Sequence, residues 1–251
     1  MRILFVSGDA VGRLGEMKRV LILASGPFGW LDRSASEVAS SIARHHDADD
    51  VITVGAIELA AASWPHRTGG PITTVRLKNG TLIDTDEIGA VLNLVRASPG
   101  QQRRFIDFLH SFNCRVINSV DAQGPLGLQS PLRWASLARR CGIETPAEGL
   151  TTSTRLLTQR AMSSAAGAPP SPTNVTVVGD RVFGAASPTH ARKCRRLARA
   201  AGCELLGLNF DEGPHRQLLA ADPFPALADH VADAVGRLLC ERATAATERV
   251  A

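Results

Sequence analysis

The stretch from residue 174 to 222 constrains the fold of this chain most, because its pattern predicts two strand hairpins joined by a helix. Apolar and β-branched residues flank short turns that contain glycine and acidic residues, as hairpin connections require. The first hairpin is expected at 175–178 and 181–185, and the second at 204–210 and 217–221. The stretch therefore predicts the order strand, strand, helix, strand, strand.

The helix between the hairpins is expected at 188–201 and is strongly basic. Ser187 is placed to cap it, a proline follows at the first helical position, and Gly202 is placed to end it. Four arginines fall on one helical face, namely Arg192, Arg195, Arg196 and Arg199. That face could bind phosphate groups or an acidic partner, or it could be a solvated helix surface.

The first half of the chain alternates strands with helices, which predicts an α/β layer with a mostly parallel sheet. Strands are expected at 19–24, 51–57, 72–77, 81–83 and 114–120. Helices are expected at 31–45, 84–97, 101–112 and 130–141. Ser34 and Glu37 are spaced as a capping box for the first helix, and the acids at 84–87 favour a helix start at that position.

Two domains are predicted, at 1–126 and 127–251, with a proline-rich join at 163–173 inside the second. A helix is expected before this join, at 151–162, and an amphipathic helix at 227–242 is expected to close the fold. Residues 243–251 are expected to fray. The sequence does not decide whether residues 1–16 belong to the natural start.

Composition narrows the class of protein. A hydrophobic share of 44% with 21% charged residues is typical of a soluble globular protein. The chain has no tyrosine and only 4% aromatic residues, which disfavours stacking on nucleic-acid bases. Its five cysteines include no C-x-x-C pair, so neither a disulfide framework nor a zinc site is expected. With no apolar run of about 20 residues, the sequence predicts a cytoplasmic protein without a membrane span.

Four segments together resemble the ATP-grasp superfamily, and within it the carboxylate–amine ligases that mature ribosomal peptides. They are 77–99, Asn118 with 130–153, the hairpin at 175–185, and LLGLNF with LLAADPFPAL at 205–227. The resemblance implies an amino-terminal pre-ATP-grasp-like α/β domain with a mostly parallel sheet. A reduced ATP-grasp-like α+β core is expected to follow it.

The chain departs from the family pattern at two places. The join before the hairpin at 175–185 holds no lysine or acidic residue, and it is too short for the strands and lid that bind nucleotide in the family. The last hairpin carries Asn209 where the family has Asp, and Ala220 and Asp222 where it has Glu and Asn. Magnesium prefers carboxylate oxygens, so the resemblance implies a truncated and degenerate member.

Three functions follow as hypotheses. The first is a non-catalytic pseudoenzyme that binds a peptide, a small molecule or an active ATP-grasp partner, with no cofactor of its own. The second is a minimal ligase that needs ATP, Mg²⁺ and a partner subunit to join a carboxylate to an amine. The third is an anion or nucleic-acid binding module that uses the helix at 188–201, although nucleic acid is not the expected partner. A homodimer is a further alternative.

The candidate site residues are few, and no catalytic residue is assigned. Asn209 and Asp222 are the candidate metal contacts. Arg181, Arg192 and Arg196 are the candidate contacts for an anionic substrate or partner. The alternative for all five is an ordinary polar role on a hairpin or a helix surface.

Overall fold

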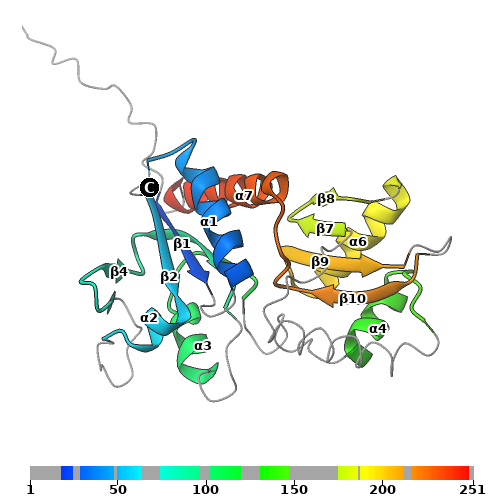
Figure 1. Cartoon of the computed structure of the whole chain (residues 1–251), viewed down its shortest axis with the longest axis horizontal. Helices are drawn as coiled ribbons and strands as arrows, with labels where there is room; N and C mark the ends of the chain where they lie inside the picture. Colours follow the sequence, from blue (N-terminus) through cyan, green and yellow to red (C-terminus); the bar gives the residue numbers. More distant parts are fainter. Residues whose placement is uncertain are drawn as a thin grey trace, which may run out of the picture.

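The structure is a computed structural model of the 251-residue chain, and two four-stranded sheets form its framework (Figure 1). The residues that it describes are 18–24, 29–47, 50–63, 74–95, 102–119, 131–146, 175–185, 187–211 and 216–248. The helix expected at 151–162, the join at 163–173 and residues 1–16 lie outside the described residues.

The first sheet is parallel throughout, as the sequence predicts. Its strands stand in the order β2 (Val51–Gly55), β1 (Arg19–Ala24), β5 (Ile88–Asn93) and β6 (Arg115–Ile117). Every residue of β5 is buried, and so is every residue of β1 after its first. Continuous burial of this kind is expected where helices cover both faces of a parallel sheet.

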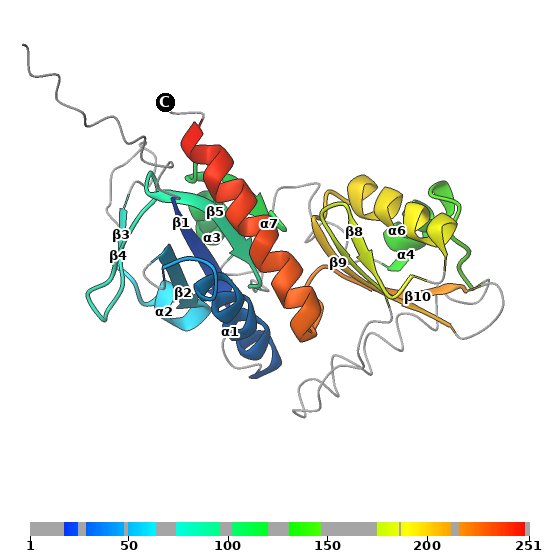
Figure 2. The same ribbon diagram turned by 90° about the horizontal axis from the view of Figure 1, so that it is seen from above.

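Alternate side chains of β1 point to two different cores. Val20 and Ile22 pack with α1 (Gly29–Ala43) and α7 (Asp229–Glu248), which lie across one face of the sheet (Figure 2). Leu21 and Leu23 pack on the other face. That face is covered by α2 (Ala56–Ala60), α3 (Gln102–His110) and the hairpin of β3 (Thr74–Arg76) and β4 (Leu82–Asp84).

The helix expected at 84–97 is wrong, because this segment holds the central strand β5. The acids before it form a turn instead of a helix start: Asp84 Oδ1 accepts a hydrogen bond of 3.0 Å from the backbone N of Asp86. Glu87 pairs with Arg19 at 3.2 Å, beside the start of β1. A short apolar run fits a buried strand as well as a buried helix, and the neighbouring strands decide between them.

Three smaller expectations also need correction. Ser34 lies inside α1, where its Oγ accepts a hydrogen bond of 3.2 Å from the backbone N of Leu227, so it is not a cap. Strand β2 ends at Gly55, where α2 begins, rather than at residue 57. Residues 243–248 do not fray, since α7 continues to Glu248.

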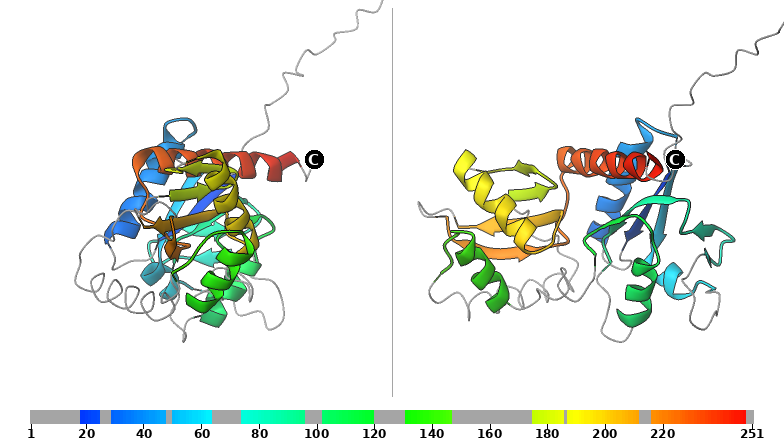
Figure 3. Two further views of the ribbon diagram at one scale, coloured as in Figure 1. Left: turned by 90° about the vertical axis from the view of Figure 1, so that its right-hand side faces the viewer. Right: turned by 180° about the vertical axis from the view of Figure 1, so that it is seen from behind.

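The second sheet is antiparallel and confirms the two hairpins predicted at 174–222. Its order is β10 (Leu218–Asp222), β9 (Leu205–Phe210), β7 (Val175–Val178) and β8 (Arg181–Phe183). The helices α4 (Pro131–Arg140) and α6 (Pro188–Ala200) lie side by side on one face of it (Figure 3, right). Ser187 caps α6 as predicted, accepting a hydrogen bond of 3.1 Å from the backbone N of His190.

The two sheets share one apolar core at their junction. Val178, Leu205, Phe224 and Leu227 from the second half pack into the cluster that α1 and α7 form over the first sheet. Helix α7 thus lies on the first sheet although it follows the second in sequence (Figure 1). The boundary at residues 126 and 127 stays a prediction.

Asn118 is the polar link of this junction. It follows β6 with a backbone φ of 58° and is 1% exposed. Its Nδ2 donates to the carbonyl of Pro223, and its Oδ1 accepts a hydrogen bond of 3.3 Å from the backbone N of Leu205. Its own carbonyl accepts from Asn93 Nδ2 at 3.0 Å. One side chain therefore holds both ends of the β9–β10 hairpin against the first sheet.

Candidate functional site

The second sheet has one apolar face and one polar face. Leu206, Leu208 and Phe210 of β9 point toward α4 and α6. The residues between them, Gly207 and Asn209, therefore lie on the other face, because side chains alternate along a strand. The polar face is where the sequence predicts metal contacts.

Strand register brings the two candidate metal contacts to the same face. Asn209 pairs with Ala220, and Asp222 pairs with Gly207, so Asn209 and Asp222 are diagonal neighbours across β9 and β10. Thr176 of β7 pairs with Gly207 and belongs to this face as well. The residues paired with Asn209 and Asp222, Ala220 and Gly207, are therefore both small.

The donor set does not fit a magnesium site of the kind that the family resemblance implies. Directly across from Asn209 stands the methyl group of Ala220, and Asp222 Oδ1 accepts a hydrogen bond of 2.9 Å from the backbone N of Phe224. One amide and one carboxylate remain where the resemblance implies an aspartate, a glutamate and an asparagine, and Mg²⁺ prefers carboxylate oxygens. Within the described ranges, no group of three or more histidines, cysteines or acids could hold a metal ion.

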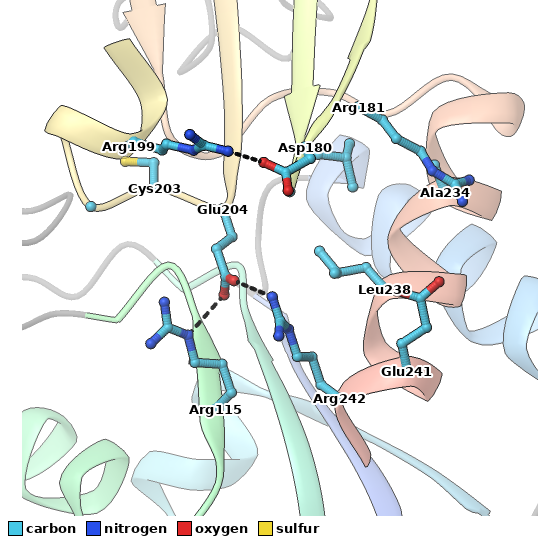
Figure 4. A pocket seen from close by; sticks show the side chains of 13 residues that line it. Arg115, Asp180, Arg181, Arg199, Cys203, Glu204, Ala234, Leu238, Glu241 and Arg242 are labelled. Atoms are coloured by element: carbon cyan, nitrogen blue, oxygen red, sulfur yellow. Dashed lines mark hydrogen bonds and ion pairs between the residues drawn. The ribbon is translucent and has the colours of Figure 1, made fainter. Parts of the chain in front are cut away.

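A cavity of about 480 Å³ opens where the β7–β8 turn, the end of α6 and the middle of α7 meet (Figure 4). Seven charged side chains dominate its lining, namely Arg115, Asp180, Arg181, Arg199, Glu204, Glu241 and Arg242. Arg181 is the one sequence candidate that lies here, and in Figure 4 it extends toward Ala234 of α7. Four arginines against three acids leave the lining slightly cationic, with a net charge of about +1, which favours an anionic ligand only weakly.

Glu204 is held between two arginines at one end of this cavity (Figure 4). Its Oε2 lies 3.1 Å from Arg115 Nε of β6, and its Oε1 lies 3.1 Å from Arg242 Nη2 of α7. The Glu204 side chain is 16% exposed, whereas the arginines are 63% and 45% exposed. The pair of bridges ties the start of β9 to the first sheet and its last helix.

Arg115 and Arg242 also line a second cavity, of about 880 Å³, at the amino ends of the parallel strands. Lys18, Asp86 and Asn113 add polar groups to it. Because the two cavities share these arginines, the bridges to Glu204 stand between them. Sequence reasoning missed Arg115, Glu204 and Arg242, since they come from three elements far apart in the chain.

The thiol in the cationic cavity is not a nucleophile. Cys203 lines the cavity, and burial raises the pKa of its thiol to about 12. It is therefore protonated near neutral pH, whereas the thiolate is the reactive form. All five cysteines are free, as expected from their spacing.

Removing the Arg199 guanidinium is expected to raise the pKa of the Asp180 carboxyl. Arg199 Nη2 lies 2.6 Å from Asp180 Oδ1, and this hydrogen bond, with the charge of Arg199, holds the pKa below its ordinary value of 3.8. A depressed carboxyl pKa stabilises the fold above the unfolded-state value and loses that effect as pH falls through the folded-state value. Both side chains are largely exposed, so the stabilisation itself is small.

A carboxyl-detected NMR titration of Arg199→Ala checks this expectation. The Asp180 resonance should titrate at higher pH than in the unmodified chain. Arg196→Ala is the matched control, because Arg196 is one turn away on the same helix and does not contribute to the shift. Equal pKa values in the unmodified chain and Arg199→Ala would contradict the pairing.

Arg192 and Arg196 lie elsewhere. Both are exposed on α6, on the side of the second sheet opposite Asn209 and Asp222. Strand register places Arg181 on the same face of the second sheet as Asn209 and Asp222, because it pairs with Val178 of that face. Since Arg192 and Arg196 lie on the other side, the five candidate residues do not form one site.

The chain thus combines a parallel α/β layer with an antiparallel sheet whose last hairpin leads into a helix on the first sheet. Solved structures share this fold. The chain is similar to the macrocyclase MdnB from Microcystis aeruginosa MRC, with 16% identity over 89% of this chain and 99% of that chain and a TM-score of 0.64. The fold expected from the sequence, which resembles that of the ATP-grasp ligases described next, is confirmed.

Two further solved structures have a fold similar to that of this chain. One is a RiPP-associated ATP-grasp ligase from Chryseobacterium gregarium, solved with ADP and a leader and core peptide; it is 11% identical over 90% of this chain and 97% of that one, with a TM-score of 0.61. The other is the ATP-grasp ligase PsnB with a minimal precursor, Mg and ADP, at 14% identity, 92% and 98% coverage and a TM-score of 0.57. No protein-family model and no curated protein matches the chain. The likeness extends over nearly the whole of these known chains.

Proposed function

We propose that this chain is an ATP-grasp-like protein of peptide modification that acts as a binding or accessory partner rather than as a catalyst. The observation that carries the proposal is the register of the last hairpin, which sets Ala220 across from Asn209. The remaining carboxylate, Asp222, already accepts a backbone hydrogen bond in the turn that follows. This hairpin therefore lacks the acidic pair that would hold Mg²⁺ against nucleotide phosphates.

A peptide is the ligand that we propose first. The similar chain from Chryseobacterium gregarium and PsnB were both solved with their peptides, which supports a peptide for this fold. The cavity that contains Arg181 could instead receive a small anionic ligand, and an active ATP-grasp enzyme is a third possible partner. The five free cysteines favour a reducing compartment such as the cytoplasm. Over the described residues, no helix combines the length and the apolar character that a membrane span requires.

Millimolar Mg-ATP is expected to leave the melting temperature of the chain unchanged. A ligand that binds only the folded state at a thousandfold excess over its Kd would stabilise that state by about 4 kcal/mol. Such a gain is easily seen by differential scanning fluorimetry. A concentration-dependent rise in melting temperature with Mg-ATP, absent with ATP and a chelator, would overturn the proposal.

A variant in which carboxylates are restored to the β9–β10 hairpin makes this experiment more specific. The variant Asn209→Asp with Ala220→Glu places a carboxylate on each side of the β9–β10 register while keeping the strand pairing. Stabilisation of this variant by Mg-ATP, with none in the unmodified chain, would support the loss of metal ligands at these two positions.

A minimal ligase that works with a partner subunit is the second candidate function. The observation in its favour is that Asn209 and Asp222 lie on the same face of the sheet, next to the small residues Gly207 and Ala220. Release of ADP in the presence of a partner protein and a peptide, lost in Asp222→Ala, would favour this candidate over the first.

A further inference from the structure

The two helices that cover one face of the second sheet, α4 and α6, carry many basic residues and no acidic ones. Helices α4 and α6 carry eight of the 28 lysines and arginines of the chain and none of its 24 acidic residues. The rest of the chain holds 20 basic and 24 acidic residues and is therefore net acidic. The net positive charge of the protein thus comes from two neighbouring helices.

Basic side chains of the two helices lie close together at the carboxyl end of α4. The Lys193 side chain of α6 comes within 3.7 Å of where a β-carbon on Gly142, just after α4, would lie. Burial raises the pKa of the Cys141 thiol, and the charges of Arg196 and Arg140 act on it in the opposite direction. Arg140 and Arg196 are therefore both close to the end of α4, and both are exposed.

Favourable interaction with the helix dipoles explains the positions of only some of these basic residues. Arg139 and Arg140 end α4 and Arg199 ends α6, where cations interact favourably with the helix dipole. Arg192 and Lys193 lie in the amino-terminal half of α6, where the dipole does not favour a cation. Like charges at helical spacing also repel one another. A ligand with opposite charge would relieve this repulsion.

We infer that the face formed by α4 and α6, termed here the basic face, docks an acidic segment of a peptide. Seven of its eight cations are arginines, whose planar guanidinium groups bind carboxylates through two parallel hydrogen bonds. On α6, Arg192 and Arg196 are about 5–6 Å apart, which matches two carboxylates one helical turn apart, whereas Arg199 is paired with Asp180.

A peptide fits the basic face better than a nucleic acid. The aromatic side chains of the two helices point inward: Trp134 is 7% exposed, and the His190 ring packs edge-on against Phe210. Within the described residues of α4 and α6, the basic face therefore offers no ring on which bases could stack. The choice of a peptide rests on the proposed function, whereas the charge pattern does not depend on it. Docking here needs neither ATP nor the polar sheet face.

Fluorescence anisotropy with a short labelled peptide of alternating glutamate and alanine tests the inference on the full chain. The unmodified chain should bind the peptide at low ionic strength, and binding should weaken as salt screens the charges. The double variant Arg192→Glu with Arg196→Glu should bind it at least about tenfold more weakly. Its thermal melt should be no lower than that of the unmodified chain, since reversing two charges relieves repulsion.

The matched control reverses two exposed arginines outside the basic face, Arg76→Glu with Arg237→Glu, and gives the same change in net charge. This variant should bind the peptide within about twofold of the unmodified chain. Equal losses in both double variants, or no binding by the unmodified chain, would overturn the inference. Tighter binding of a single-stranded RNA of the same charge would overturn it in favour of a nucleic acid. None of these outcomes depends on Mg-ATP, so the proposed function is tested separately.

Discussion

Replacing Asn118 with alanine is expected to lower the free energy of unfolding by about 4 kcal/mol. The substitution removes the hydrogen bonds that the side chain makes with Leu205 N and Pro223 O at the junction of the two sheets. Leaving each partner without its bond costs about 1–3 kcal/mol. Alanine must also adopt the left-handed φ of 58°, which costs about a further 1 kcal/mol. Chemical denaturation, followed by fluorescence and circular dichroism, measures the total.

Asn118→Gly separates the two contributions. Glycine adopts a positive φ without strain, so this variant should recover about 1 kcal/mol relative to alanine while losing the same two hydrogen bonds. A cost below about 1 kcal/mol for both variants would show that the side chain does not hold the junction. The two probes should report one coincident transition if the sheets unfold together.

Replacing Gly89 with valine is expected to cost about 3 kcal/mol or more, because α7 approaches the first sheet at this residue. A β-carbon on Gly89 would lie 2.7 Å from Lys18 Cβ and 2.8 Å from Ala243 Cα. The second contact is with the backbone of α7, which cannot move aside as a flexible side chain could. The variant should unfold at markedly lower denaturant concentration, and hydrogen exchange should rise first in α7.

Gly89→Ala and Gly55→Ala form the matched pair for this clash, because a β-carbon alone meets the α7 backbone at Gly89. Gly55 has an ordinary extended backbone, and a β-carbon there would meet only the Glu58 side chain, at 3.5 Å. Its stability should stay within about 0.5 kcal/mol of the unmodified chain. Similar losses at both positions would show that α7 does not approach the sheet as closely as described.

Local signals predicted the second sheet and its helix correctly. Short turns, a serine cap and a proline at the first helical position define the elements from 175 to 222 without help from distant residues. The segment at 88–93 was misassigned for the opposite reason. Its apolar run suits a helix or a buried strand, and only its pairing with β1 and β6 makes it a strand.

The residues of the candidate site also differ in whether local sequence signals could predict their positions. A strand pattern can place Asn209 and Asp222 on one face, because register within a hairpin is local. The bridges from Glu204 to Arg115 and Arg242 join residues that no sequence spacing relates. The sequence indicated Asn118 only through the family resemblance. Its hydrogen bonds to Pro223 and Leu205, which join the two sheets, become evident only in the folded structure.

The position of α7 has a consequence for how the chain is synthesised. Helix α7 covers Val20, Ile22 and Leu92 of the first sheet, yet the ribosome makes it after both sheets. Until it emerges, the part of this apolar face that α1 does not cover stays open to water, and such surfaces promote aggregation. The amino-terminal layer therefore cannot complete its core until α7 has emerged, and a chaperone that binds apolar segments could act during this interval.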